Sequence, residues 1–197
     1  MELLGERWAM LVLRELAYGP RRFSELKADL QGISANVLTQ RLGELEGRCL
    51  VRKDRLPPPA SVQVYEATPW GLEAVPLIAS LGRWAARSPW HDPTLQMSHV
   101  SVMMSLQTLL SPALAGGLDA RIGFQFGETS YVATIRDGRL DVDRTKADDC
   151  EVVFSGAPSE IAALIHGGAP FDMIEVKGDM DLARRFVTLF PLPPKIG

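Results

Sequence analysis

Apolar residues recur at helical spacing near the start of the chain and predict a first helix. The residues with this spacing are Leu4, Trp8, Leu11 and Leu16. Gly19 and Pro20 follow them. Because proline cannot continue a helical hydrogen-bond ladder, we expect the helix to end before this pair.

A second helix is predicted by the short amphipathic run that ends at Leu30. Ser24 precedes this run and is its expected N-cap, since a serine hydroxyl accepts a hydrogen bond from a free backbone N–H of the first turn. Gln31-Gly32 is the expected stop.

Ser34 is the expected N-cap of a third helix, in which Leu38, Leu42 and Leu45 share one face. We expect these leucines to point inward. The opposite face then presents a polar, slim and almost uncharged set of residues: Asn36, Thr39, Gln40 and Gly43.

A β-hairpin is predicted next, from two β-prone segments at 50–54 and 62–67. The loop at 55–61 contains three consecutive prolines and cannot pair as a strand. Thr68-Pro69 then opens another helix as N-cap and first residue, with a kink predicted at Pro76. Three helices followed by a hairpin are the order of a winged helix-turn-helix domain.

The apolar residues of the first and last of these helices exceed what so small a domain buries alone, which indicates a homodimer interface. The residues expected in that interface are Leu4, Trp8, Leu11, Leu72, Leu81 and Trp84.

The pattern changes at residues 88–95, where two prolines interrupt the helical spacing. We therefore predict two domains, 1–88 and 96–197. The second begins with a helix at 98–110 that is apolar on more than one side and must be buried. Alternating strands at 121–126, 131–136, 139–143 and 150–155, and helices at 158–166 and 180–189, predict an α+β domain with an antiparallel sheet.

Charge is distributed unevenly along the 197 residues, whose formal net charge is -3. Residues 7–55 carry ten Lys or Arg and six Asp or Glu, a balance of +4, whereas residues 93–197 carry nine and thirteen, a balance of -4. The positive balance of residues 7–55 suggests an anionic partner, although such an excess of positive charge is often only a solvated face. The composition, 46% hydrophobic and 23% charged, without a membrane-length apolar stretch, indicates a soluble cytoplasmic protein.

Motifs for other chemistry are weak. Cys49 and Cys150 have no metal-ligand spacing and are expected to be reduced thiols, and the three histidines lack HxxxH or HExxH spacing. No nucleophile motif occurs in GxSxG register. We therefore expect no enzyme activity, catalytic residue, metal or cofactor.

The first half of the chain resembles the HxlR-type winged-helix transcriptional regulators. The resemblance covers about residues 3–87 and is carried by Leu4-Gly-Glu-Arg-Trp8, Leu13-Arg-Glu-Leu16, Gly19-Pro-Arg-Arg-Phe-Ser-Glu-Leu26, Gly32-Ile-Ser34, Leu38-Thr-Gln-Arg-Leu42, Leu45-Glu46, Leu50-Val51, Val64-Tyr-Glu-Ala-Thr-Pro-Trp-Gly71 and Trp84. It implies a homodimer that binds double-stranded operator DNA, with the third helix in the major groove and the proline-rich wing along the flanking backbone.

Several polar and basic residues of this half are expected to contact DNA. Amide and hydroxyl groups on the third helix can hydrogen-bond base edges, and long cations at the turn and the wing can meet phosphates. For each cation the alternative is a solvated surface side chain. The expected set is Arg21, Arg22, Ser34, Asn36, Thr39, Gln40, Arg41, Arg52, Lys53 and Arg55.

Two cysteine positions depart from this family. Many members have a cysteine just ahead of the first helix that senses oxidants, whereas this sequence reads Met1-Glu-Leu-Leu, so we do not expect redox sensing by that route. Cys49 stands where the family usually has glycine, at a turn that favours positive φ. We interpret Cys49 as a small packing residue, with a reactive thiol as the alternative.

The second half resembles the sterol-carrier-protein domain over residues 97–192. The matching segments are Tyr131-Val-Ala-Thr-Ile-Arg-Asp-Gly-Arg-Leu140, Asp149-Cys-Glu-Val-Val-Phe154, Pro158-Ser-Glu-Ile-Ala-Ala-Leu-Ile-His-Gly167 and Val176-Lys-Gly-Asp-Met-Asp-Leu182. The resemblance implies a tunnel for an elongated apolar molecule, such as a fatty acid or isoprenoid. Adaptable apolar side chains are the candidates to line it, with plain core as the alternative for each. They are Met103, Met104, Leu106, Leu110, Phe124, Phe126, Phe171, Met173, Phe186 and Phe190.

These patterns together predict a one-component transcriptional repressor whose second domain senses an apolar small molecule. The alternative is a lipid carrier or accessory protein in which the winged helix serves only for dimerisation or protein binding.

Overall fold

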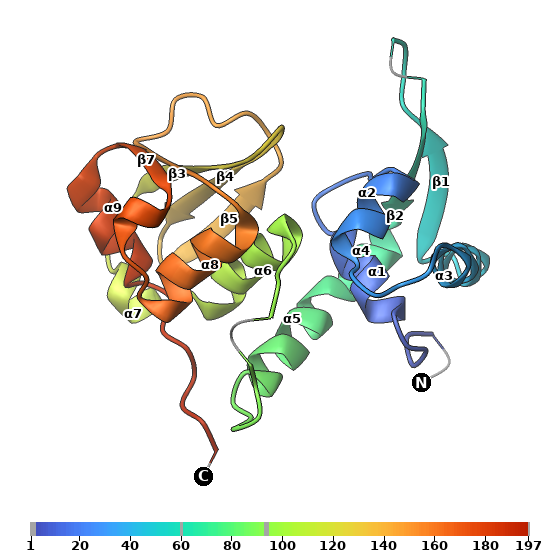
Figure 1. Ribbon diagram of the computed structural model, residues 1–197, viewed down its shortest axis with the longest axis horizontal. Coiled ribbons are helices and arrows are strands. Elements are labelled where there is room, and N and C mark those ends of the chain that lie inside the picture. Colours follow the sequence, from blue (N-terminus) through green and yellow to red (C-terminus); the bar gives the residue numbers. More distant parts are fainter. Residues whose placement is uncertain (1–2, 60, 93–94, 197) are drawn as a thin grey trace. The chain divides into compact units, whose positions relative to one another are not determined.

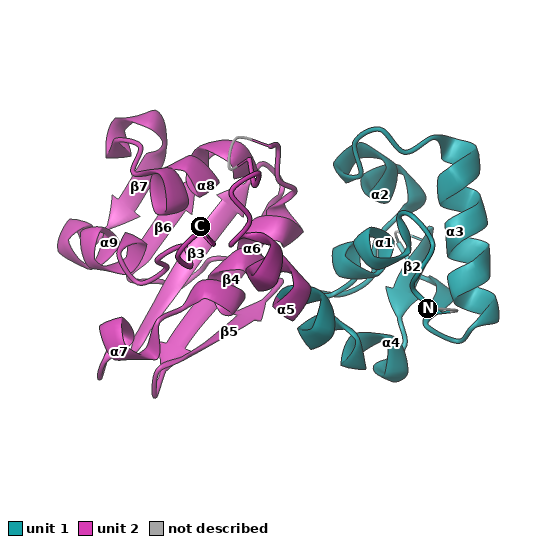
Figure 2. Ribbon diagram, turned by 90° about the horizontal axis from the view of Figure 1, so that it is seen from below, with its two compact units in different colours: residues 1–79 teal, residues 80–197 magenta. Residues whose placement is uncertain are grey.

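The computed structural model describes residues 3–59, 61–92 and 95–196. The chain forms two compact units, Met1–Ala79 and Ser80–Gly197 (Figure 2). The division falls inside α5 (Val75–Ala85), so one helix begins in the first unit and ends in the second. The predicted linker at 88–95 belongs to the second unit, and its residues 93 and 94 lie outside the described residues. The predicted domain boundary there stays a prediction.

The first unit begins with α1 (Ala9–Glu15), which starts later than the leucine spacing predicts (Figure 1). Trp8 adopts a left-handed φ of 78°, and this conformation ends the helical hydrogen-bond pattern on its N-terminal side. Leu16 is buried, and so is Leu13, which the predicted spacing did not include.

Helix α2 (Phe23–Asp29) follows, and Arg22 rather than Ser24 is its N-cap residue. The expectation for Ser24 was therefore wrong. Glu25, in the first turn, accepts a hydrogen bond from the Arg22 backbone N–H at 2.7 Å and replaces the expected serine cap.

Helix α3 (Ala35–Gly47) has the predicted cap and the predicted amphipathic pattern. The Ser34 hydroxyl accepts a hydrogen bond from the Val37 N–H at 3.2 Å. Leu38, Leu42 and Leu45 are fully buried, and α3 packs against α1 and the hairpin.

The hairpin consists of β1 (Val51–Arg55) and β2 (Gln63–Ala67), paired antiparallel from Val51 opposite Ala67 to Arg55 opposite Gln63. Residue 60 of the connecting loop lies outside the described residues. Arg21 pairs with β2 as an isolated antiparallel bridge, because its backbone exchanges two hydrogen bonds with that of Tyr65.

After the hairpin the chain forms α4 (Pro69–Glu73) and then α5, where one kinked helix was predicted. Thr68 caps α4 as expected by accepting the Gly71 N–H at 3.0 Å. The separation at Ala74 comes just before Pro76, which has no N–H to donate to the preceding turn.

The second unit contains helices α6 (His99–Leu109), α7 (Pro112–Ala115), α8 (Pro158–Gly167) and α9 (Met180–Val187) and a short 3-10 helix, η1 (Phe171–Met173). Its strands are β3 (Ala120–Phe126), β4 (Thr129–Arg136), β5 (Arg139–Asp143), β6 (Val152–Ser155) and β7 (Glu175–Gly178). The major helices and β3–β6 were predicted; α7, η1 and β7 were not.

The sheet of the second unit is mixed, with strand order β5-β4-β3-β6-β7. The prediction of an antiparallel sheet was wrong for one pair: β3 and β6 run parallel, with Phe124 opposite Phe154. The chain between β5 and β6 crosses to the far side of β3 instead of turning back beside β5, which gives the parallel direction.

One face of this sheet carries the core of the unit. Phe124 and Phe154 stack at a ring-centroid distance of 5.5 Å, and Phe186 of α9 lies 5.9 Å from Phe124. Phe190 packs on Phe186 at 4.9 Å. Since Tyr131 lies opposite Phe124 in the pairing of β3 with β4 and contacts His99 of α6, helices α6 and α9 cover the same face.

Among the described residues, no helix is long and apolar enough to span a membrane.

Candidate nucleic-acid interface

Helix α3 presents its polar side to solvent. Its three buried leucines fix the rotation of the helix about its axis, and Ser34 fixes its start. The opposite side is therefore outward, and Asn36, Thr39, Gln40 and Gly43 are exposed as predicted. Short amides and hydroxyls without net charge are suited to hydrogen bonding with base edges in the major groove.

A chain of polar contacts runs along α3. The Gln40 amide nitrogen donates to Glu44 Oε1 at 2.9 Å, and Glu44 Oε2 lies 2.5 Å from Arg41 Nη1. Glu6 Oε2 lies 3.3 Å from the same guanidinium nitrogen. Glu44 is a residue that the sequence reasoning missed, although its i,i+4 spacing from Gln40 was a usable signal.

Arg41 is 8% exposed, which contradicts the expectation that it lies on the DNA-facing surface. Its guanidinium is paired with two carboxylates, Glu44 of α3 and Glu6 near the N-terminus. The leucine spacing could not reveal this, because position 41 borders the buried face and a long side chain there reaches either way.

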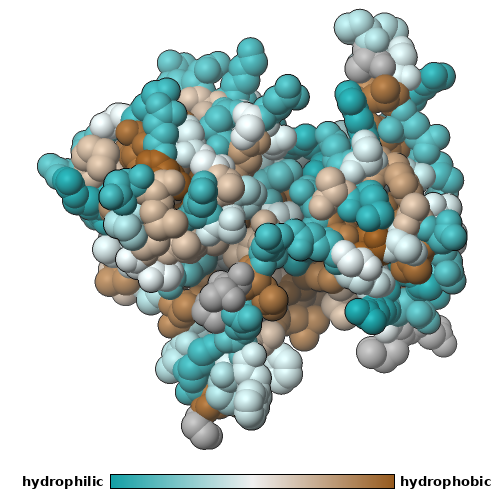
Figure 3. All heavy atoms as spheres, in the orientation of Figure 1, coloured by the Kyte–Doolittle hydropathy of each residue, from teal (hydrophilic) through white to brown (hydrophobic). Residues whose placement is uncertain are grey.

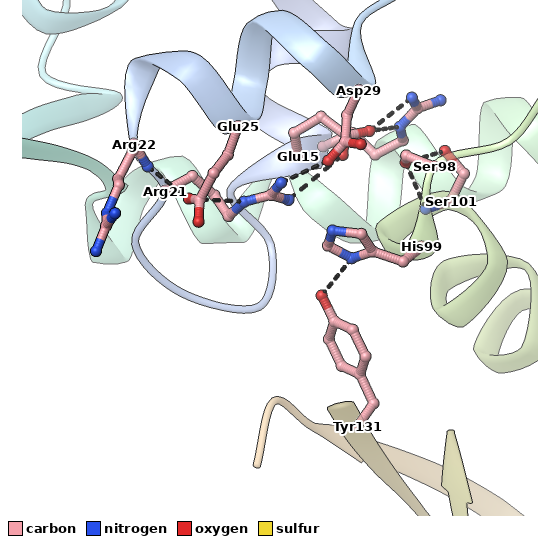
Figure 4. Close-up of polar contacts among 10 residues, drawn as sticks. Glu15, Arg21, Arg22, Glu25, Asp29, Ser98, His99, Ser101 and Tyr131 are labelled. Carbon is pink, nitrogen blue, oxygen red and sulfur yellow. Dashed lines mark hydrogen bonds and ion pairs between the residues drawn. The ribbon is translucent and has the colours of Figure 1, made fainter. Parts of the chain in front are cut away.

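Arg21 is also buried, at 3% exposure, and this corrects a second expected DNA contact (Figure 4). Its guanidinium lies 2.5 Å from Asp29, 3.4 Å from Glu25 and 3.8 Å from Glu15. Burial alone would lower the pKa of Arg21, but the hydrogen bond to Asp29 and the three carboxylate charges outweigh it and raise the pKa. Arg21 is therefore a structural cation that joins α1, α2 and β2.

Arg22, next in the chain, is exposed, and Figure 4 shows its side chain pointing away from these carboxylates. Its backbone N–H donates to Glu25. Two adjacent arginines thus have opposite surroundings: one is buried in an ion-pair network, and the other is available to solvent or to an anionic partner.

The wing carries the remaining cations. On β1, Arg52 pairs with Glu66 at 2.6 Å and Lys53 with Glu46 at 2.8 Å. Both cations are exposed, and their hydrogen bonds to these carboxylates raise the pKa of each. They remain fully protonated at neutral pH, but the paired carboxylates already neutralise part of their positive charge.

Arg55, at the end of β1, is exposed, and its Nε donates to the Ser61 carbonyl oxygen at 2.9 Å. This bond holds the proline loop at its base. The positive charge of the side chain stays at the surface of the wing.

The model of the HxlR-like helix-turn-helix family matches residues 3–92. The chain is 34% identical over 94 residues to the HTH-type transcriptional regulator YvaP of Bacillus subtilis, covering 48% of this chain and 85% of YvaP. The chain belongs to the HxlR-like helix-turn-helix family. A second relative, the HTH-type transcriptional regulator YodB of Bacillus subtilis, is 34% identical over 83 residues, which are 42% of this chain and 74% of YodB.

The reduced form of YodB from B. subtilis is a solved structure similar to this chain, with 32% sequence identity and a TM-score of 0.41. The alignment covers 46% of this chain and 89% of that chain. The family match confirms the winged helix-turn-helix prediction for the first half of this HxlR-like chain. The family match ends at residue 92 and does not bear on the chain beyond it.

The HxlR-like chain exposes several of the residues predicted for a dimer interface. Trp84 is 71% exposed and Leu81 is 48% exposed, and both belong to α5. Leu11 and Leu72 are also exposed, whereas Leu4 and Trp8 are half-buried. Figure 3 shows apolar atoms over α5 on a largely hydrophilic surface.

Cys49 has the positive φ, 58°, that its glycine-like position in HxlR-type regulators suggests. Its thiol is exposed, so the interpretation as a packing residue was wrong. The Thr68 hydroxyl donates to the Cys49 carbonyl oxygen at 2.7 Å and holds this turn after α3.

Most residues expected to line an apolar pocket lie in the buried core of the second unit. The buried members are Met103, Met104, Leu106, Leu110, Phe124, Phe126, Phe186 and Phe190. Phe171 is half-buried, and Met173 is 48% exposed. The short η1 helix turns Met173 outward, so the structure does not bring it together with the buried set.

Two histidine contacts, one buried and one partly buried, interrupt this apolar core. His99 Nδ1 lies 2.7 Å from the Tyr131 hydroxyl, and His166 Nε2 lies 2.9 Å from the Ser105 hydroxyl. Burial lowers the pKa of His166, so its neutral form prevails at pH 7. Within the described ranges, no group of three or more His, Cys, Asp or Glu side chains is arranged to hold a metal ion.

Proposed function

We propose that this protein is a transcriptional regulator that binds double-stranded operator DNA as a homodimer, with α3 in the major groove. The observation that carries the proposal is the exposed, uncharged polar face of α3 in a chain of the HxlR-like family. Asn36, Thr39 and Gln40 offer donors and acceptors on one side of a helix whose start and rotation are fixed. A good bidentate contact from such a residue contributes about 1–3 kcal/mol of base discrimination.

Phosphate contacts are assigned to the exposed cations Arg22, Arg52, Lys53 and Arg55. Exposed ion pairs such as Arg52–Glu66 contribute little stability and exchange readily for a phosphate partner. Each phosphate neutralised releases condensed counterions and makes binding dependent on salt. Arg21 and Arg41 are left out, because both are buried and paired.

Selection from random genomic fragments tests DNA binding with the full chain. The wild type is expected to enrich one near-palindromic sequence, and Gln40→Ala is expected to enrich it less. A wild-type protein that enriches no sequence would overturn the proposal. It would favour the second candidate function, in which the winged helix serves a lipid carrier as a dimerisation or protein-binding module.

Dimerisation is assigned to the exposed apolar side of α5. Leu77, Leu81 and Trp84 follow one another at helical spacing and are all exposed in the single chain. Burying such side chains is favourable by about 1.5–3 kcal/mol each, enough together to drive self-association.

Sedimentation tests this interface. The wild type is expected to be a dimer at micromolar concentration, and Leu81→Lys a monomer. Leu114→Lys is the matched control, since Leu114 is a comparably exposed leucine on α7. A monomeric wild type, or two variants that dissociate equally, would contradict the assignment.

The second unit is assigned to sensing, as a sterol-carrier-protein-like domain that binds an apolar effector such as a fatty acid or isoprenoid. Support comes from the adaptable buried side chains of α6, Met103 and Met104, beside the aromatic core. An effector that binds here is proposed to change operator affinity.

A route for that change exists within the second unit, at the end of α5. Arg83 of α5 donates to the Thr108 carbonyl oxygen of α6 at 2.8 Å. Near the C-terminus, Lys195 Nζ donates to the Ala86 and Ser88 carbonyl oxygens at 3.1 and 2.9 Å. Because α5 also carries the proposed dimer residues, a shift of α6 is expected to alter the dimer.

Mass spectrometry of organic extracts from native protein, followed by operator titration with the recovered compound, tests the sensor. A bound apolar compound that changes operator affinity supports it. An empty protein whose affinity is unchanged across a panel of fatty acids and isoprenoids would remove the sensor and leave DNA binding intact.

A further inference from the structure

We infer that Glu44 is a positioning residue that makes Gln40 select adenine over guanine. The inference rests on the proposed DNA-binding function of α3. It concerns which hydrogen-bonding groups Gln40 presents to a base, and it follows from the contact between these two side chains.

The Gln40 amide faces a group that can only accept hydrogen bonds. Its Nε2 lies 2.9 Å from Glu44 Oε1, one helical turn along α3. An ionised carboxylate has no hydrogen to donate. The amide must therefore turn its NH2 toward Glu44 and its carbonyl oxygen away from it.

Glu44 is itself held in place by a second contact. Its other oxygen, Oε2, lies 2.5 Å from Nη1 of Arg41, which is buried and also lies 3.3 Å from Glu6. The positive charge of Arg41 holds one carboxylate oxygen in an ion pair, and the other oxygen accepts the hydrogen bond from Gln40. The Gln40 amide thus has one orientation before any DNA arrives.

This orientation matches adenine. One hydrogen of the Gln40 NH2 is used by Glu44, which leaves one donor and the carbonyl acceptor for a base. Adenine presents an acceptor, N7, and a donor, the N6 amino group, in the major groove. Guanine presents two acceptors, N7 and O6, and leaves the Gln40 carbonyl facing another acceptor.

Glu44→Gln tests the inference because it changes one oxygen into NH2 at nearly constant size. The buried Arg41 requires the remaining oxygen, so the new NH2 faces Gln40. Gln40 must then accept with its own carbonyl and present its NH2 outward. The variant is expected to shift preference from adenine toward guanine at one base pair of each half-site.

Selection from a randomised double-stranded DNA library, followed by binding titrations of the enriched site and its A-to-G variant, measures the preference. The wild type is expected to favour adenine by roughly tenfold, and Glu44→Gln to favour guanine or to show less than about twofold preference. In a Gln40→Ala background, Glu44→Gln should have no effect at this base pair. A residue that only stabilised the helix would not produce this dependence on Gln40.

Glu46→Gln is the matched control. Glu46 lies on the same helix and pairs with Lys53 rather than with Gln40, so the substitution removes the same charge without touching the amide. It is expected to leave the adenine preference in place. Thermal unfolding of each variant shows whether it is folded; if Glu44→Gln is not, Glu44→Ala replaces it and is expected to abolish the preference.

The outcomes are distinct. A wild-type protein that enriches no sequence overturns the proposed function, and this inference with it. A wild-type protein that enriches a site without adenine preference at the base pair sensitive to Gln40 overturns this inference alone. So does an adenine preference that survives in the folded Glu44 variant, or one that Glu46→Gln abolishes equally.

Discussion

Replacing Arg21 with Met should destabilise the first unit strongly, although the new side chain is apolar and similar in length. Arg21 is the common cation of Glu15, Glu25 and Asp29. Glu15 is 0% exposed and keeps Arg14 at 2.7 Å from its Oε1, but removal of the Arg21 guanidinium takes away the cation that lies 3.8 Å from its other oxygen. The loss also uncouples α1 from α2.

The size of the effect follows from this burial. Removing one partner of a buried ion pair costs about 3–5 kcal/mol, and because Arg14 stays paired with Glu15 the loss is expected at the lower end of that range, about 3 kcal/mol. The total stability of a domain is about 5–15 kcal/mol, so the variant should lose a large share of it. With a urea dependence of about 1–3 kcal/mol per molar, the midpoint should fall by roughly 2 M.

Urea unfolding followed by amide hydrogen exchange resolves this loss, because peptides from α1 and α2 report the first unit separately from the second. Arg22→Met is the matched control: the neighbouring arginine is exposed, and its substitution should change stability by less than about 0.5 kcal/mol. A loss under about 1 kcal/mol for Arg21→Met, or equal losses for the two variants, would refute the reasoning.

In DNA binding the same two variants should show the opposite order of effects: Arg22→Met should change the salt dependence, and Arg21→Met should not. Where Arg21→Met is still folded, its salt dependence should equal that of the wild type. Arg22→Met should lower the slope of log affinity against log salt by about 0.9 for each phosphate that the arginine neutralises in the wild-type complex. Equal slopes for Arg22→Met and wild type would remove Arg22 from the proposed interface.

Three further predictions follow from single positions. Gln40→Ala should reduce the preference for operator over random DNA, whereas Arg55→Ala should weaken binding to both DNAs alike and reduce its dependence on salt. Titrations at several salt concentrations measure both effects. If Gln40→Ala weakened binding to both DNAs equally, α3 would not be the element that recognises the base sequence. Cys49→Gly should stabilise the protein by about 0.5–1 kcal/mol in urea unfolding, since it removes a Cβ from a residue with positive φ and an exposed side chain. Burial lowers the pKa of His166 below its value in the unfolded chain, so the stability from this residue is complete above about pH 6.5 and is lost as the pH falls below it. In His166→Gln, the free energy of unfolding should therefore depend less steeply on pH between about pH 6.5 and 5 than in the wild type. An unchanged slope would contradict this.

Hydrophobic spacing predicted the elements that bury one face and expose the other to solvent. Leu38, Leu42 and Leu45 defined the inner side of α3, and Asn36 and Gln40 were placed outward as a consequence. The hairpin was predicted from two β-prone segments and the proline-containing loop between them. These features depend on residues near one another in the chain, where periodicity carries the signal.

The buried arginines were missed because their surroundings come from several elements. Arg21 is neutralised by carboxylates of α1 and α2, and Arg41 by one carboxylate of its own helix and another from Glu6. A sequence pattern assigns charged residues to the surface, and that rule fails where partners converge in space. The spacing of Arg21 from Glu25 and Asp29, four and eight residues, was the available local signal.

In the second unit, the strands were predicted but one of their directions was not, because the direction depends on the path of the chain between them. A Cβ on Gly123 would lie 2.7 Å from Cβ of Ala147, a residue of the segment that crosses from β5 to β6. That close approach requires glycine in the middle of β3, and an isolated glycine within a strand pattern was its only trace in the sequence.

The crossing places β6 parallel to β3 and brings Phe154 beside Phe124, so the mixed sheet builds the aromatic core that α9 then covers. Phe124 and Phe186, two of the residues expected to line the apolar pocket, are therefore also part of the core that closes the sheet. Because each buried phenylalanine contributes about 1.5–3 kcal/mol, an effector must replace those contacts with its own apolar surface. The effector proposed above must therefore be apolar, because a small polar metabolite would leave those contacts unreplaced.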